Sequence, residues 1–170
     1  MPLNFEFKAR CPEPDRVRDV LRRMNAEPAG IDQQTDTYFN VSSGRLKLRA
    51  GSVEQNLIYY NRGDSASPKR SEVWLAPCPE PGPLLDVLSN ALGVWVVVEK
   101  RREIYFLGGT KIHLDDVPGL GSFVEVEVIA DSATADSKKM RAECDDWMHR
   151  LGVQEEDLVS ASYSDMILPV

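Results

Sequence analysis

Polar and apolar residues alternate with a period of two in several separate segments of this 170-residue chain, and many of the polar positions carry a charge. Near the N-terminus, Asn4, Glu6 and Lys8 alternate with Phe5 and Phe7. Successive side chains of a β-strand point to opposite faces, so each segment of this kind predicts a strand with one ionic and one apolar face.

Eight segments predict strands, and three amphipathic segments predict helices. The expected strands cover residues 4–8, 32–40, 44–50, 56–62, 69–76, 94–107, 110–116 and 122–128, and the expected helices cover 14–25, 84–92 and 136–151. Short turns join most neighbouring strands, which favours a largely antiparallel sheet in an α+β fold. Four prolines between positions 77 and 83 predict a connector inside one domain that spans residues 1–170.

The three helices can cover the apolar faces of the strands, so the ionic face must look away from them. In an open sheet this face would contact solvent, and in a closed barrel it would line a charged interior. Composition does not decide between the two, but the charges are segregated by sign. The first and last strands carry Glu6, Glu125 and Glu127, with Asp115 on the neighbouring strand, and the strands between them carry Arg45, Lys47, Arg49, Arg62, Lys100 and Arg102.

This segregation matches the needs of a metal–polyphosphate complex. Arg and Lys bind phosphate oxygens through charge-assisted hydrogen bonds. Two carboxylates at i and i+2 of one strand, with a third from another strand, can hold Mg²⁺ or Mn²⁺. Each strand alone is more often a solvated edge, so the hypothesis rests on their occurrence together. No Walker-type glycine loop and no zinc deaminase motif is present.

Composition argues against several other classes of protein. A formal net charge of −7 disfavours a general nucleic-acid or anionic-membrane surface. Cys11, Cys78 and Cys144 have no metal-like spacing and are expected to be reduced. The longest apolar run, residues 94–98, is too short to span a bilayer, and the charged N-terminal strand is unlike a signal peptide. A cytoplasmic protein is therefore expected.

Several segments together resemble the CYTH superfamily, the triphosphate tunnel enzymes, and within it the class IV adenylyl cyclases. The resemblance lies in residues 4–8, 36–39, 44–49, 99–105 and 119–127, which occur in the family's order, and it extends from Leu3 to the region of Tyr163. It implies an eight-stranded antiparallel closed β-barrel with flanking helices, whose charged tunnel holds the substrate. It also implies Mg²⁺ or Mn²⁺ as the cofactor.

The resemblance implies roles for individual residues by motif position. The implied metal ligands are Glu6, Glu125 and Glu127, with Asp115 as a metal or catalytic partner beside Lys100 and Arg102. The expected substrate-binding residues are Lys8, Arg45, Lys47, Arg49, Arg62, Lys100, Arg102, Lys111 and His113. Asn4 departs from the family pattern, which has a glutamate there. This asparagine keeps a ligand oxygen but removes a negative charge, and should weaken metal binding.

Three functions remain open from the sequence. Residues 99–128 and 139–144 look closest to bacterial class IV cyclases, which favours conversion of ATP to cyclic AMP and pyrophosphate. The intact Glu125 and Glu127 pair suits a triphosphatase acting on tripolyphosphate, thiamine triphosphate or a nucleoside triphosphate equally well. Asn4 leaves room for a non-catalytic polyphosphate or nucleotide binder. The expected partner is a small-molecule triphosphate, without nucleic acid or membrane, and the resemblance allows a homodimer.

Overall fold

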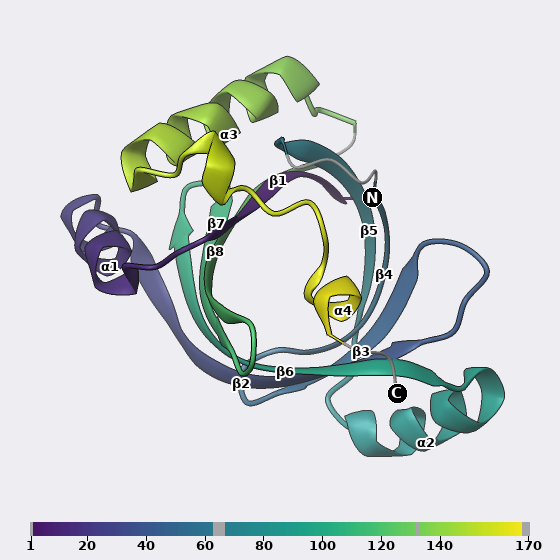
Figure 1. The fold of residues 1–170 in the computed structure, drawn as a ribbon. Coiled ribbons are helices and arrows are strands. Elements are labelled where there is room, and N and C mark those ends of the chain that lie inside the picture. Colours follow the sequence, from purple (N-terminus) through teal and green to yellow (C-terminus); the bar gives the residue numbers. More distant parts are fainter. Residues whose placement is uncertain (1, 63–66, 132, 168–170) are drawn as a thin grey trace.

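The structure, a computed structural model, describes residues 2–62, 67–131 and 133–167. In this part of the chain eight strands close into a barrel in the order β1-β5-β4-β3-β2-β6-β7-β8, and each neighbouring pair is antiparallel (Figure 1). The strands are Pro2–Arg10 (β1), Glu27–Phe39 (β2), Arg45–Gly51 (β3), Gln55–Arg62 (β4), Lys69–Pro77 (β5), Val94–Leu107 (β6), Thr110–Val117 (β7) and Gly121–Asp131 (β8). The closed barrel that the resemblance implied is confirmed, and closure removes both sheet edges.

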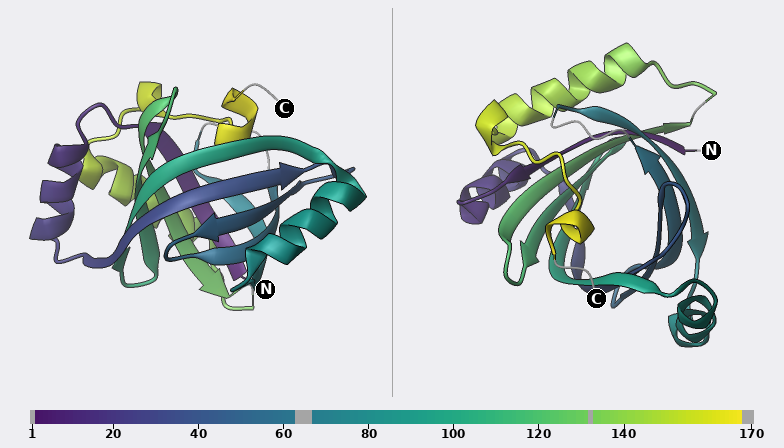
Figure 2. Two further views of the ribbon diagram at one scale, coloured as in Figure 1. Left: turned by 90° about the horizontal axis from the view of Figure 1, so that it is seen from below. Right: turned by 45° about the vertical axis from the view of Figure 1, so that its right-hand side comes forward.

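Three helices lie outside the barrel, as expected, and a fourth lies at one of its ends. They are Pro14–Arg23 (α1), Pro81–Leu92 (α2), Ser137–Leu151 (α3) and Tyr163–Met166 (α4), with a 3₁₀ turn at Glu155–Asp157. Figure 2 shows α4, in yellow near the C label, at one end of the barrel and the start of β1 at the other. Among the described residues, no helix is both long enough and apolar enough to cross a membrane.

Several boundaries differ from the prediction by a few residues, and two of these differences have a clear local cause. The expected connector at 77–83 is shorter, because Pro77 ends β5 while Pro81 and Pro83 lie in the first turn of α2. Proline is tolerated there because the first backbone N–H groups of a helix have no intrahelical partner. Strand β2 starts at Glu27 rather than at residue 32. Its first residues were missed because a register shift between Pro28 and Gly30 interrupts the polar–apolar alternation there.

The main apolar core lies between the outer face of the barrel and helices α1 and α3. It contains Phe5 and Phe7 of β1, Val126 of β8, Leu21 of α1 and Trp147 of α3, all buried. Because Phe5 and Phe7 face outward, their neighbours Asn4, Glu6 and Lys8 face the barrel interior. The same alternation turns charged residues of β3, β6, β7 and β8 inward, whereas on β5 Arg70 and Glu72 face away from the cavity that Val73 and Leu75 line.

A second core fills one end of the barrel. Tyr163 of α4 is buried against Phe123 of β8, with ring centroids 5.0 Å apart, and Val96 and Val98 of β6 belong to the same cluster. The segment before α4 is tied to β1, since the backbone N–H of Val159 donates to the carbonyl of Lys8. The C-terminal segment therefore narrows this end of the tunnel. The prediction that Tyr163 and Met166 pack is confirmed, while Leu168 lies outside the described residues.

Candidate metal and phosphate tunnel

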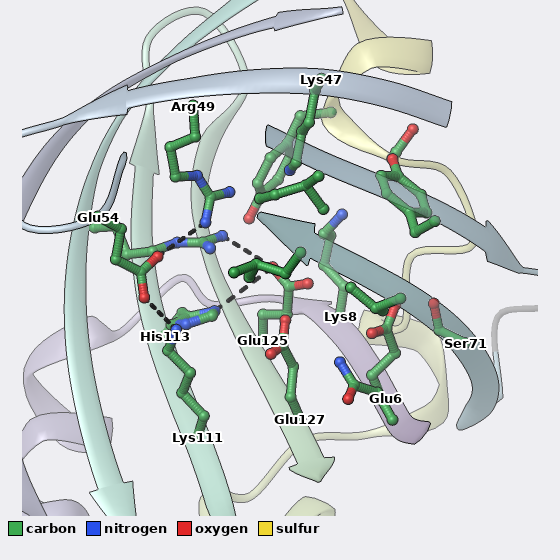
Figure 3. A pocket seen from close by; sticks show the side chains of 18 of the residues that line it. Glu6, Lys8, Lys47, Arg49, Glu54, Ser71, Lys111, His113, Glu125 and Glu127 are labelled. Carbon is green, nitrogen blue, oxygen red and sulfur yellow. Dashed lines mark hydrogen bonds and ion pairs between the residues drawn. The ribbon is translucent and has the colours of Figure 1, made fainter. Parts of the chain in front are cut away.

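The barrel encloses a cavity of about 440 Å³ that receives side chains from all eight strands (Figure 3). Most of the predicted site residues line it, namely Glu6, Lys8, Lys47, Arg49, Lys100, Arg102, Lys111, His113, Glu125 and Glu127. These residues are far apart in the sequence. The barrel closure brings them together in one tunnel.

A basic wall, formed by Lys47, Arg49 and Lys100, is organised around one carboxylate. Asp36, fully buried on β2, accepts hydrogen bonds from Nε and Nη2 of Arg49 at 2.9 Å, from Nζ of Lys47 at 2.9 Å and from Nζ of Lys100 at 2.8 Å. Burial would raise the pKa of Asp36, but the charges of Arg49, Lys100 and Lys47 hold this pKa well below its usual range. The three cations are thus held in place by a permanent anion.

The ammonium group of Lys100 is the most perturbed cation of this wall. Burial, which outweighs the attraction of Asp36, lowers the pKa of Lys100 to about 7. An additional anion beside Lys100 would favour its protonated form. The basic wall can therefore take up both a phosphate and a proton.

An acidic wall, formed by Glu6 of β1 with Glu125 and Glu127 of β8, lies across the tunnel. Glu6 stands opposite Glu127 in the strand pairing, and His113 of β7 stands opposite Glu125. Burial, together with the charges of Glu125 and Glu6, raises the pKa of Glu127 to about 7. The crowding of these carboxylates would be relieved by a cation.

His113 completes a group that could hold such a cation. Ligand atoms of His113, Glu125 and Glu127 all lie within 4.8 Å of one another. Burial and the charge of Arg102 lower the pKa of His113 to about 4, so the imidazole is neutral. Neither of its buried ring nitrogens is within hydrogen-bond distance of a partner among the described residues, and the nearest carboxylate oxygen, of Glu125, lies 3.9 Å from Nδ1 (Figure 3). A neutral imidazole with two carboxylates fits Mn²⁺ well, and Mg²⁺ through the carboxylates and water.

Asp115 lies behind this group rather than in the cavity lining. Its two oxygens accept hydrogen bonds from Nε and Nη2 of Arg102, at 2.7 and 2.6 Å, and from the hydroxyl of Tyr163 at 2.7 Å. Nη2 of Arg102 also donates to Glu125 at 3.0 Å. In this arrangement Asp115 orients Arg102, and its predicted role as a metal or catalytic partner stays a prediction.

Among the predicted substrate-binding residues, Arg45 is placed differently, and the prediction for Arg62 falls on an undescribed side chain. Arg45 does not line the cavity; its guanidinium stacks on Trp95 at 4.9 Å and binds Asp165 of α4 at 3.0 Å. Its position at the start of β3, beside α4, explains the difference. Arg62 ends β4, opposite Ser71, and its side chain lies outside the described part of the structure.

The tunnel also has an apolar wall that sequence reasoning missed. Ile58 and Tyr60 of β4 and Val73 and Leu75 of β5 line it, with Ile129 at the end of β8. In the barrel order β4 and β5 lie between the basic strand β3 and the acidic strand β1. Alternation predicted that Ile58 and Tyr60 share a face, but not that this face is the interior. The wall can contact a part of a ligand that carries no charge.

Several residues that shape the tunnel were not among the predicted site residues, among them Asp36 behind the basic wall and the lining residues Glu54 and Tyr163. Asp36 shares a strand face with Tyr38, and the period-two pattern could have placed it beside the cations of β3. Glu54 lies in the turn between β3 and β4, where no periodic signal exists. Tyr163 lies in a helix of four residues, too short for a periodic pattern.

Comparison with known proteins places this arrangement in a family. The family model for the CYTH domain matches residues 3–163. Adenylate cyclase CyaB of Aeromonas hydrophila is 26% identical in an alignment 171 residues long. The alignment covers 93% of this chain and 85% of that protein.

Solved structures share the fold. The PH1012 protein of Pyrococcus horikoshii superposes with a TM-score of 0.84 at 24% identity, over 96% of this chain and 99% of the other. A candidate adenylyl cyclase from Hippeastrum with a dominant triphosphatase activity superposes with a TM-score of 0.59 at 13% identity, over 95% and 92% of the two chains. The family model matches nearly the whole chain and the barrel is closed and charged inside, so this chain belongs to the CYTH domain family.

Proposed function

We propose that this protein is a divalent-metal-dependent enzyme that acts on an organic triphosphate, with conversion of ATP to cyclic AMP and pyrophosphate as the favoured reaction. The observation that carries the proposal is the presence of three kinds of wall in one cavity. The basic wall suits phosphates, the acidic wall suits a metal ion, and the apolar wall suits an uncharged organic group. Similarity to adenylate cyclase CyaB supports the choice of ATP.

The basic wall would hold the phosphate chain. Lys47, Arg49 and Lys100 are fixed by Asp36, so they can bind phosphoryl oxygens without first being ordered. In phosphoryl transfer the protein mainly positions groups and stabilises charge. When the ribose 3′-oxygen forms a bond to the α-phosphorus, the bond to the bridging oxygen breaks and pyrophosphate leaves. These three cations would stabilise the charge that develops on that leaving group.

The acidic wall and His113 would hold the metal ion. Glu125, Glu127 and His113 supply the converging ligand atoms, and Glu6 stands opposite Glu127. A bound Mg²⁺ or Mn²⁺ would supply Lewis-acid polarisation of phosphate oxygens. Arg102, oriented by Asp115, would bind a phosphate oxygen beside this site. Asn4 lines the same region of the tunnel and offers a neutral oxygen.

The apolar wall would hold the organic group. Ile58 and Tyr60 lie on the strand next to the cations of β3, so a base or similar ring attached to the phosphates could rest against them. Inorganic tripolyphosphate has no group for this wall. The proposal therefore favours an organic triphosphate over tripolyphosphate.

The second candidate is a triphosphatase that hydrolyses the terminal phosphate of such a substrate. The basic wall and the metal-binding group would serve water attack at the terminal phosphorus as well as attack by a ribose oxygen. The test is product analysis by ³¹P NMR after incubation with ATP, thiamine triphosphate or tripolyphosphate, each with Mg²⁺ or Mn²⁺. Cyclic AMP and pyrophosphate are expected from ATP. Orthophosphate release would make the protein a triphosphatase, and binding without turnover would make it a non-catalytic binder.

A further inference from the structure

A carboxylate, Glu54 in the turn between β3 and β4, already sits among the tunnel cations. One oxygen of Glu54 accepts from Nη1 of Arg49 at 2.9 Å, and the other pairs with Nζ of Lys111 (Figure 3). Arg49 lies on β3 and Lys111 on β7, and strands β2 and β6 separate these two strands in the barrel. The side chain of Glu54 therefore joins cations that the sheet itself does not bring together.

The turn that carries Glu54 is fixed by a buried side chain. Asp32, fully buried on β2, accepts hydrogen bonds from the hydroxyl of Ser52 at 3.1 Å and from the backbone N–H groups of Val53 and Glu54 at 2.9 Å. A Cβ atom on Gly51 would lie 2.5 Å from the Glu54 carbonyl oxygen and 2.6 Å from Asp32. The backbone of the turn is thus tightly packed, and the free motion left to Glu54 is rotation of its side chain.

The contacts of Glu54 are those that a phosphate group would make. Each oxygen of its carboxylate meets a different cation, and phosphoryl oxygens bind Arg and Lys in the same charge-assisted manner. Burial would raise the pKa of Glu54, but the charges of Lys111 and Arg49 lower it to about 2, so this carboxylate stays ionised. An incoming phosphate must therefore compete with a permanent internal anion.

We propose that Glu54 occupies a phosphate subsite between Arg49 and Lys111, and that a phosphate ligand binds there only by displacing the Glu54 side chain. The inference rests on the proposed function, because it takes the tunnel to be a polyphosphate site. The cost of displacing Glu54 is the largest share of the binding free energy for ortho- and pyrophosphate, because these short phosphates make few other contacts in the tunnel. A triphosphate also reaches the cations around Asp36. Glu54 would thus weaken the retention of short phosphates and favour release of the product.

The test measures binding without turnover. Isothermal titration calorimetry would follow pyrophosphate and tripolyphosphate binding to the wild type and to Glu54→Gln, with EDTA at low ionic strength. Glu54→Gln should bind pyrophosphate about tenfold more tightly, because the competing charge is gone. The matched control is Glu99→Gln, on the exposed outer face of β6, which makes the same change in net charge and should leave the affinity unchanged. Unchanged or weaker binding by Glu54→Gln would overturn the proposal.

A second variant tests the mechanism of the gain. In a Lys111→Met background the gain from Glu54→Gln should fall below about threefold, because the two side chains share one subsite. If Glu54→Gln unfolds, Glu54→Asp replaces it; the shorter side chain cannot span both cations, so tighter pyrophosphate binding is again expected, and its absence contradicts the proposal. Wild-type protein that binds neither phosphate would overturn the proposed function and the subsite with it. Wild-type binding without a gain in the Glu54 variants would overturn only the role of Glu54.

Discussion

The basic and acidic walls of the tunnel differ in how their charge is balanced. The basic wall carries its own counter-ions, since Asp36 binds Lys47, Arg49 and Lys100. The acidic wall places Glu6, Glu125 and Glu127 close enough that burial and like charge raise the pKa of Glu127 to about 7. One wall is thus organised before any ligand arrives, whereas the other would gain from a cation. The difference explains how one small barrel can attract both partners of a metal–polyphosphate complex.

The largest effect is expected from removing the central anion of the basic wall. Asp36→Asn leaves buried Arg49 and Lys100 and partly buried Lys47 without their shared carboxylate, and breaking a buried ion pair from one side costs about 3–5 kcal/mol of unfolding free energy. Urea unfolding followed by circular dichroism measures the loss. The control is Asp19→Asn, whose partner Arg22 is exposed, with an expected loss of no more than about 1 kcal/mol. Equal losses would mean that the basic wall is not held together by Asp36.

The acidic wall should respond in activity rather than in stability. Glu125→Gln and Glu127→Gln should each reduce metal-dependent turnover by about 100-fold or more, since each removes a charged metal ligand. Thermal unfolding should show that the fold is retained, because Glu127→Gln relieves crowding among carboxylates and Glu125→Gln keeps a neutral hydrogen-bond acceptor for Arg102 in place of the ion pair at 3.0 Å. Full turnover in both variants would contradict the assigned metal site.

A smaller effect is expected at Asn4, the position that departs from the family pattern. Asn4→Glu adds a fourth carboxylate to the acidic wall and should tighten Mn²⁺ binding about tenfold, as ligand charge is a main determinant of affinity. Asn4→Gln is the matched control, because the glutamine side chain is as long as that of glutamate but carries no charge. Calorimetric titration with Mn²⁺ separates the two, and equal affinities would show that Asn4 lies outside the reach of the metal.

The smallest effect concerns protons in the basic wall. At pH 8 Lys100, with a pKa of about 7, is mostly neutral, and a bound phosphate should restore its proton. At pH 8, with EDTA present, the wild type should therefore take up as much as one proton more than Lys100→Met when tripolyphosphate binds. This difference in proton uptake should vanish at pH 6. Calorimetry in buffers of different ionisation enthalpy measures it. Equal proton uptake in both proteins at pH 8 would show that Lys100 does not face the phosphate.

The same pKa has a consequence for stability. The pKa of Lys100 is lower in the folded chain than its ordinary value of 10.5, so between about pH 7 and 10.5 the folded chain holds fewer protons than the unfolded one. Stability from this group therefore rises with pH across that window and is lowest below about pH 7. Urea unfolding at pH 6 and 9 should show this rise in the wild type and a smaller one in Lys100→Met.

Alternation in the sequence predicted which side chains share a face because the period of a strand is fixed at two. Glu125 with Glu127, and Lys100 with Arg102, accordingly project into one tunnel. Closure of the barrel came from the resemblance, since an alternating strand has the same pattern in a sheet and in a barrel. The roles of these side chains in binding and chemistry are still predictions.

The positions of the remaining site residues depend on long-range contacts, which the local alternation of the sequence does not predict. Glu54 points inward because Asp32, 22 residues earlier, binds the turn before it. Tyr163 reaches Asp115 because a four-residue helix lies at the barrel end, 48 residues away in the chain. Arg45 keeps the alternation of β3 but stands beside α4, where Asp165 binds it. Each of these placements is a long-range contact between a strand and a loop or short helix.

The most direct test of the two-wall account is the position of both ligand parts in one crystal. Crystals soaked with Mn²⁺ and tripolyphosphate should show an anomalous peak among His113, Glu125 and Glu127, with phosphate oxygens against Lys47, Arg49 and Lys100. That result would show that the acidic wall takes the cation and the basic wall the anion. Manganese bound elsewhere, or phosphate outside the tunnel, would contradict the account.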